Sequence, residues 1–199
     1  MDTTPFTGFD NQGLDVCFIH DYRQLHPFTP DGLSRYDQVH LVAWSMGVWA
    51  AGKFLNANGA NLTSSTALGG TLSPIDPDRG IPPERYENLV STFGDQTLDD
   101  FYRAMFDDPA GLARFLAHRP QHSLPALANE LHAFRQAFLE HGDGVDIFTR
   151  KLVTKRDRIF SGRNQLRAWG KENAHNLPWP HFPFYGLSGW RALIDDHLA

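Results

Sequence analysis

One passage of the sequence places a strand, a helix and a second strand in direct succession. The β-branched and aromatic run at 39–44 (VHLVAW) predicts a strand. After Ser45, apolar residues recur at helical spacing until about Asn58-Gly59, and residues 63–68 (TSSTAL) predict a weaker strand. Two strands joined through a helix form a βαβ unit, so the chain is expected to build a parallel sheet of the α/β class.

The rest of the chain adds to this unit at both ends. Residues 15–20 (DVCFIH) predict another buried strand, and residues 150–155 (RKLVTK) a short one near the other end. Between them, the proline-rich stretch at 73–83 excludes regular structure, and helical patterns follow for about sixty residues. We therefore expect an α/β core with a helical insertion at about 75–145, and a last helix capped by Ser188.

Composition excludes several classes of protein. The chain has 199 residues and a formal charge of −5, which argues against a nucleic-acid-binding domain. It lacks an apolar run long enough to span a membrane, and its polar first residues do not resemble a signal peptide. A single cysteine, Cys17, cannot form an internal disulfide or a thiolate zinc cluster. We expect a cytoplasmic protein, a monomer, without metal or cofactor.

Ser45 lies at the junction between the predicted strand and helix, in the sequence A-W-S-M-G. A serine on such a sharp turn, with small residues two positions away on either side, is how α/β-hydrolases present a nucleophile. The helix N-terminus behind it and the backbone N–H of Met46 could stabilise an oxyanion. An ordinary serine N-cap would fit the same five residues.

The order of residues in an α/β-hydrolase triad is serine, acid, histidine. Asp157, directly after the strand at 150–155, is the favoured acid, and Asp76, after the strand at 63–68, is the alternative. His181, in the P-H-F-P-F loop before the last helix, is the favoured general base. Its competitors are His175, in a polar stretch, and His197, near the C-terminus.

Four blocks carry a resemblance that covers nearly the whole chain: HDYRQL (20–25), YDQVHLVAWSMGVWAA (36–51), ALGGTLSPIDPDRGIPP (67–83) and PHFPF (180–184). They resemble the BioG-type pimeloyl-acyl-carrier-protein methyl ester esterases. The resemblance implies one α/β-hydrolase domain over 1–199, with the insertion as its cap. It also implies removal of a methyl ester from a pimeloyl group on acyl carrier protein, a late step in making the biotin precursor. Ser45, Asp157 and His181 match the family's nucleophile, acid and base.

The family begins with a further strand and a G-W-G-M-D turn, and the resemblance implies that this chain starts inside that turn at Met1-Asp2. The expectation is therefore a missing inner strand and a missing second oxyanion donor, which serves any acyl substrate. Two rival functions stay open on these grounds: a generalist carboxylesterase or thioesterase, and a non-catalytic, truncated binding protein with a hydrolase-like fold.

Acyl carrier protein is acidic, so its docking surface should be basic. One candidate is the segment from Arg150 to Lys171, which holds eight basic residues and one acid and includes Lys155. The other is the insertion, with Arg114 and Arg119. A merely solvated charged face is the alternative for both. Trp44, next to the predicted nucleophile, is expected to line the substrate pocket.

Overall fold

The computed structural model describes residues 1–28, 32–55 and 62–195. In this part of the chain, four strands form one parallel sheet in the order β1-β2-β3-β4. The strands are β1 (Val39–Trp44), β2 (Leu62–Leu68), β3 (Arg150–Thr154) and β4 (His175–Leu177). The predicted α/β class and the βαβ unit at 39–68 are confirmed.

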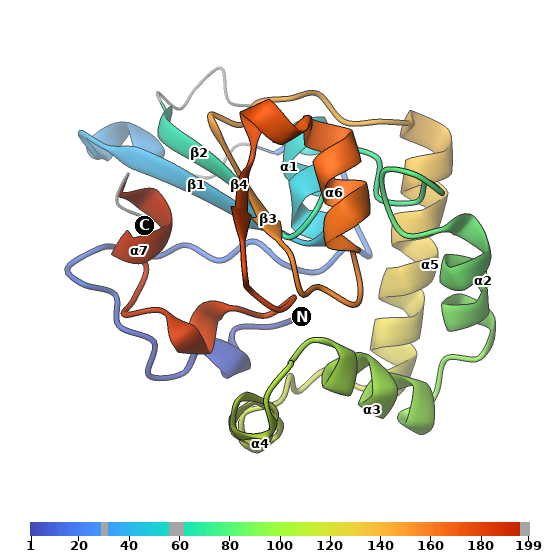
Figure 1. Cartoon of the computed structure of the whole chain (residues 1–199). Coiled ribbons are helices and arrows are strands. Elements are labelled where there is room, and N and C mark those ends of the chain that lie inside the picture. The colour runs from blue at the N-terminus through green and yellow to red at the C-terminus, as the bar shows by residue number, and fades with distance from the viewer. Residues whose placement is uncertain (29–31, 56–61, 196–199) are drawn as a thin grey trace.

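Helices flank the sheet on two sides (Figure 1). The two beside it are α1 (Met46–Phe54) and α6 (Gly162–Trp169). Between β2 and β3 the chain forms α2 (Pro83–Ser91), α3 (Asp95–Ala104), α4 (Pro109–Ala117) and α5 (Leu124–His141), which stand together beside and below the sheet in this view. The last helix is α7 (Arg191–Ile194). Short 3₁₀ helices occupy Thr4–Phe6, Leu33–Arg35, Lys171–Asn173 and Phe184–Gly186.

Local chemistry sets the limits of the inserted helices. Asp108 caps α4 by accepting a hydrogen bond from the Gly111 N–H at 2.7 Å, with Pro109 at the first helical position. Ser123 caps α5 in the same way, and Gly142, at φ 68°, ends it.

Aromatic packing joins the inserted helices to the sheet. Trp49 of α1 is fully buried and contacts Phe134 of α5 edge to face, with 4.9 Å between ring centroids. Its indole N–H donates to the Gly142 carbonyl at 2.8 Å. Phe182, near the C-terminus, packs in the same way on Phe115 of α4. One hydrophobic cluster therefore contains residues of the sheet, α1 and the insertion. No described helix is both long and apolar enough to cross a bilayer.

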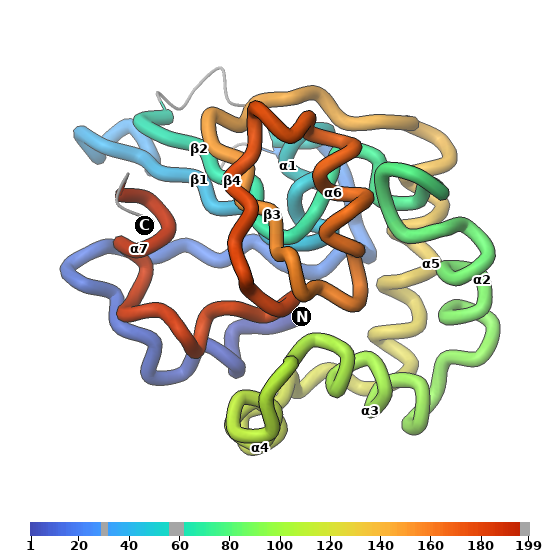
Figure 2. The backbone as a smooth tube through the Cα atoms, in the orientation of Figure 1, coloured from blue at the N-terminus to red at the C-terminus, as the bar shows by residue number. Residues whose placement is uncertain are grey.

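The prediction of a strand at 15–20 is wrong. In the part of the chain that the structure describes, these residues form no ladder, and Phe18 and Ile19 are exposed. The smooth trace in Figure 2 shows the N-terminal segment passing beneath the sheet as an irregular chain. β-branched composition gives a strand only where the segment pairs its backbone with a neighbouring strand, and in the described structure residues 15–20 do not pair in this way.

Two further expectations need correction near the C-terminus. The last helix begins at Arg191 and not next to Ser188. The short strand β4 comes from a polar stretch with no alternating pattern, so its sequence gave no signal. It forms because β3 offers its edge, with Leu152 paired to His175 and Thr154 to Leu177. The predicted end of α1 near Asn58-Gly59 lies outside the described residues.

The end of β2 passes directly behind the start of α1. A Cβ atom on Gly70 would lie 2.1 Å from the Ser45 carbonyl oxygen, closer than any side chain can approach. Gly70→Ala is therefore expected to lower the free energy of unfolding by about 1–3 kcal/mol, because the backbone must shift to admit the methyl group.

Urea unfolding of the variant measures this loss. Gly186→Ala is the matched control, since nothing lies within 4 Å of its added Cβ. It should change the free energy of unfolding by less than about 0.5 kcal/mol. Equal stability of the two variants would contradict this account of the junction.

Candidate active site

Ser45 has a backbone conformation that few non-glycine residues adopt. Its φ and ψ are 58° and −128°, between the end of β1 and the first turn of α1. Its N–H donates to the Leu68 carbonyl of β2 at 2.9 Å, which fixes the turn to the sheet. Strained residues of this kind persist where the surrounding structure holds them, and they cluster at functional sites. The sharp strand-to-helix turn predicted from the sequence is present.

Asp157 and His181 form a buried pair, although 24 positions separate them in the sequence. The His181 ring donates from Nδ1 to Asp157 Oδ2 at 2.7 Å. Asp157 is 6% exposed and His181 1%. Asp157 follows β3, and His181 lies in the loop after β4, so adjacent parallel strands deliver both side chains to one edge of the sheet.

The Asp157 carboxylate is held by four further donors. Oδ1 accepts from the N–H groups of Ile159 at 2.7 Å and Phe160 at 2.9 Å. Oδ2 accepts from Thr154 Oγ1 at 2.8 Å and Gln165 Nε2 at 3.2 Å. A carboxylate surrounded by donors accepts and does not donate, so Nδ1 of His181 carries the proton and Nε2 keeps its lone pair.

His181 is positioned from three sides. The Trp44 indole N–H donates to the His181 carbonyl at 2.8 Å, which ties the residue before Ser45 to this loop. The Phe160 ring lies parallel to the imidazole, with 6.3 Å between centroids. The next N–H, that of Phe182, donates to the Met105 carbonyl of the insertion. Nε2 is buried and has no hydrogen-bond partner within residues 1–28, 32–55 and 62–195.

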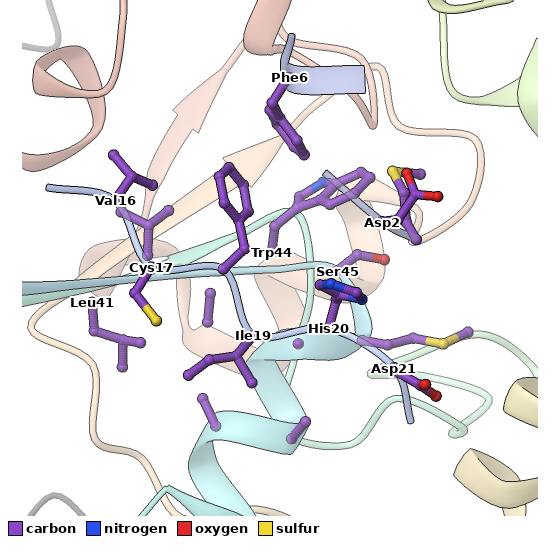
Figure 3. Close-up of a pocket in the computed structure, with 18 of the residues that line it drawn as sticks. Asp2, Phe6, Val16, Cys17, Ile19, His20, Asp21, Leu41, Trp44 and Ser45 are labelled. Atoms are coloured by element: carbon purple, nitrogen blue, oxygen red, sulfur yellow. The ribbon is translucent and has the colours of Figure 1, made fainter. Parts of the chain in front are cut away.

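Ser45 and His181 line the same cavity, whose volume is about 1430 Å³. Figure 3 shows Trp44 and Ser45 at the end of β1, with residues 16–21 of the N-terminal segment running across them. Met46 also lines the cavity, as does the apolar face of the insertion with Leu98, Phe101 and Leu131. Trp44, predicted to line the substrate pocket, is among the residues that line this cavity.

The alternative acid and bases lie elsewhere. Asp76 accepts from the N–H groups of Asp78 and Arg79 at 2.9 and 2.7 Å and pairs with the Arg79 side chain, which is the work of a turn residue. His175 is exposed on β4. His197 lies outside the described residues. Among the residues that are described, no three His, Cys, Asp or Glu side chains gather closely enough to hold a metal ion.

The candidate docking residues do not share one surface. Arg150 starts β3, at the opposite end of that strand from Asp157, and its guanidinium donates to the Leu193 carbonyl at 3.2 Å. It is therefore not at the mouth of the site as expected. Lys155 is exposed just after β3. On α4, Arg114 lies over the Tyr185 ring at 4.0 Å, and Arg119, just beyond that helix, is exposed.

Comparison with known proteins gives a family match and a similar crystal structure. Residues 9–193 match the family described as Pimeloyl-ACP methyl esterase BioG. The chain belongs to this family. The crystal structure of BioG from Haemophilus influenzae superposes with a TM-score of 0.76 at 31% sequence identity, covering 88% of this chain and 80% of that one. The α/β-hydrolase-like fold inferred from Ser45 and its surroundings is thus confirmed.

Two curated relatives are similar to this BioG-family chain in sequence. A malonyl-acyl-carrier-protein O-methyltransferase of Bacteroides fragilis (strain 638R) is 36% identical over 171 residues, which are 86% of this chain but only 35% of that protein. The chain thus spans about a third of that relative's length. An uncharacterized protein of Haemophilus influenzae is 31% identical over 189 residues, covering 94% of this chain and 84% of the relative.

Sequence reasoning missed the residues that hold the acid. Gln165 is fully buried on α6, where it contacts Asp157, Thr154 and the Phe160 carbonyl. A glutamine in a polar segment gives no sign that it faces inward. Thr154 likewise appeared only as the end of a strand.

If Ser45 is the nucleophile, a fluorophosphonate should attach to it covalently, because Ser45 lines the same cavity as His181. Ser45→Ala should abolish labelling, as read by intact mass. Ser91→Ala, at an exposed serine on α2, should leave labelling unchanged. Mapping of the label to any other serine would contradict the assignment.

Proposed function

We propose that this BioG-family protein is a serine carboxylic-ester hydrolase that removes the methyl ester from a pimeloyl group carried on acyl carrier protein. The observation that carries the proposal is the buried Asp157–His181 pair, in which His181 lines the same cavity as the strained Ser45 and its Nε2 has no hydrogen-bond partner among the described residues. Membership of the BioG family supplies the substrate class. Such a reaction belongs to the making of the biotin precursor and requires no cofactor.

In the proposed reaction, His181 Nε2 takes the proton of Ser45 as Oγ attacks the ester carbonyl. Asp157 stabilises the imidazolium that forms and keeps the proton on Nδ1. Methanol then leaves with the proton from Nε2, and water hydrolyses the acyl-enzyme by the same route. The Met46 N–H, at the first position of α1, is the proposed donor to the oxyanion, supported by the helix dipole.

The family description and the name of the Bacteroides relative both concern a methyl group on a carrier-bound acyl chain. The family description specifies a methyl ester on a pimeloyl group, and the Bacteroides relative is named for transfer of a methyl group to a malonyl group; both acyl groups are carried on acyl carrier protein. Methyl transfer needs a methyl donor, whereas a buried acid–histidine pair beside a serine suits ester cleavage. The esterase is therefore the function we propose for this chain.

Acyl carrier protein is the proposed partner, and basic residues near the cavity are the proposed docking surface. Pro120, next to Arg119, lines the cavity, and Lys155 lies two residues from Asp157. Arg114 lies on α4, and Arg119 follows two residues after the end of that helix. Arg150 is left out because its place at the far end of β3 separates it from the cavity.

Asp157→Asn should reduce kcat for a methyl ester by about 10⁴-fold, as in other enzymes that use a serine–histidine–acid triad. The amide would turn an N–H toward Nδ1, which shifts the imidazole proton to Nε2 and removes the base. Asp76→Asn is the control and should stay within a few-fold of the parent protein. Hydrolysis per mole of folded protein measures both, and the reverse order would assign the acid to the loop after β2.

Arg119→Glu should lower kcat/KM for the carrier-borne methyl ester several-fold at low salt, because a reversed charge slows association with an acidic partner. The effect should shrink at high salt. Hydrolysis of free dimethyl pimelate should not change. Arg150→Glu, at the far end of β3 from Asp157, is the matched control. Equal losses for free and carried esters would favour a generalist esterase.

A further inference from the structure

Tyr22 is fixed in place from several directions. The preceding residue, Asp21, has φ 78°, one of three non-glycine residues with positive φ among those described. Its carboxylate accepts from the Arg23 side chain and N–H. The Tyr22 N–H donates at 3.0 Å to Glu130 Oε1 of α5, a carboxylate with only 5% exposure.

The ring of Tyr22 is fixed as well. It packs edge to face on Phe134 of α5, with 5.3 Å between centroids. The strained backbone at Asp21 and the buried Glu130 carboxylate that binds Tyr22 both cost free energy. Such features cluster at functional sites. The other strained residue in this region is Ser45 itself.

The Tyr22 hydroxyl lies beside the first turn of α1. A Cβ atom on Gly47, two residues after Ser45, would be 3.3 Å from Tyr22 Oη. Tyr22, Ser45, Met46 and Gly47 all line the one cavity. The hydroxyl makes no hydrogen bond to any residue in the described ranges. A donor without a partner is thus placed at the site where a substrate carbonyl would meet the start of α1.

The charge state of Tyr22 suits a donor. Burial, reinforced by the Glu130 carboxylate, raises the pKa of the Tyr22 phenol above its ordinary value. The hydroxyl therefore keeps its proton around neutral pH. It can donate a hydrogen bond but does not compete for the Ser45 proton.

We propose that the Tyr22 hydroxyl is a second oxyanion donor, which acts with the Met46 N–H on the carbonyl oxygen of the ester bound at Ser45. This inference rests on the proposed esterase function. As Ser45 Oγ forms its bond to the carbonyl carbon, the π electrons move to the oxygen and the serine proton moves to His181 Nε2. Tyr22 donates a hydrogen bond to that oxygen without losing its own proton. The hydrogen bond weakens when the carbonyl re-forms and the bond to the methoxy group breaks.

Tyr22→Phe tests the inference, because it removes the donor and keeps the ring on Phe134. We expect kcat for a p-nitrophenyl ester to fall about 10²-fold, the effect of removing one oxyanion donor, with KM within about threefold. Covalent reaction of Ser45 with a fluorophosphonate should slow similarly, since the phosphonyl oxygen takes the oxyanion position. Rates are expressed per mole of Ser45 that reacts at the end point, so loss of folded protein does not imitate the effect.

Tyr86→Phe is the matched control. Tyr86 is fully buried, and its hydroxyl donates to the Leu131 carbonyl at 3.0 Å, which is a structural contact. This variant should melt at a lower temperature and keep the parent kcat per reactive Ser45.

The outcomes separate the inference from the function on which it rests. If Tyr22→Phe stays within threefold of the parent in both kcat and labelling rate, or if only KM changes, the inference is overturned. If Ser45→Ala hydrolyses the ester as fast as the parent protein, the proposed function fails. A large kcat loss in Tyr22→Phe, together with an inactive Ser45→Ala, supports both.

Discussion

The positive φ of Ser45 is the constraint on which the rest of the site depends. A non-glycine residue in that conformation needs its surroundings to hold it, and here the end of β2 and the turn that follows it do so. The Leu68 carbonyl accepts its N–H, and Gly70 leaves room for its carbonyl oxygen. The turn takes the chain from β1 into α1 within one residue, so that Ser45, Met46 and Gly47 all line one cavity.

Parallel strands explain how distant residues meet there. Ser45 follows β1 and Asp157 follows β3, and the loop after β4 delivers His181 to the same edge. Because all four described strands point the same way, three separate loops converge without any of them being long. The Trp44 hydrogen bond to the His181 carbonyl then joins the first of these loops to the last, so the serine and histidine sides of the site are mechanically linked.

The sequence predicts the parts of this arrangement that local patterns encode. The strands at 39–44 and 63–68 and the helical insertion follow from spacing, and the order of residues along the chain favours Asp157 and His181 over their competitors. The prediction of a strand at 15–20 is wrong because strand formation depends on pairing with another part of the chain, and local composition does not reveal such pairing. β4 is missed for the converse reason, since its polar residues pair only because β3 offers an edge. The contact of Gln165 with Asp157 could not be predicted from the sequence, because it depends on which face of α6 is buried.

The N-terminal segment, predicted to form a strand at 15–20, lines the cavity instead. Residues expected to be buried in the sheet instead run across the cavity beside Trp44 and Ser45 (Figure 3). Without backbone pairing in the described structure, their position depends on side-chain anchors such as the buried Glu130, which binds the Tyr22 N–H from α5. The insertion therefore has two physical tasks: it lines the cavity with apolar side chains, and it holds one wall of that cavity against the start of α1. Substitutions in α5 should accordingly alter the position of Tyr22 beside the start of α1, and not only the shape of the acyl pocket.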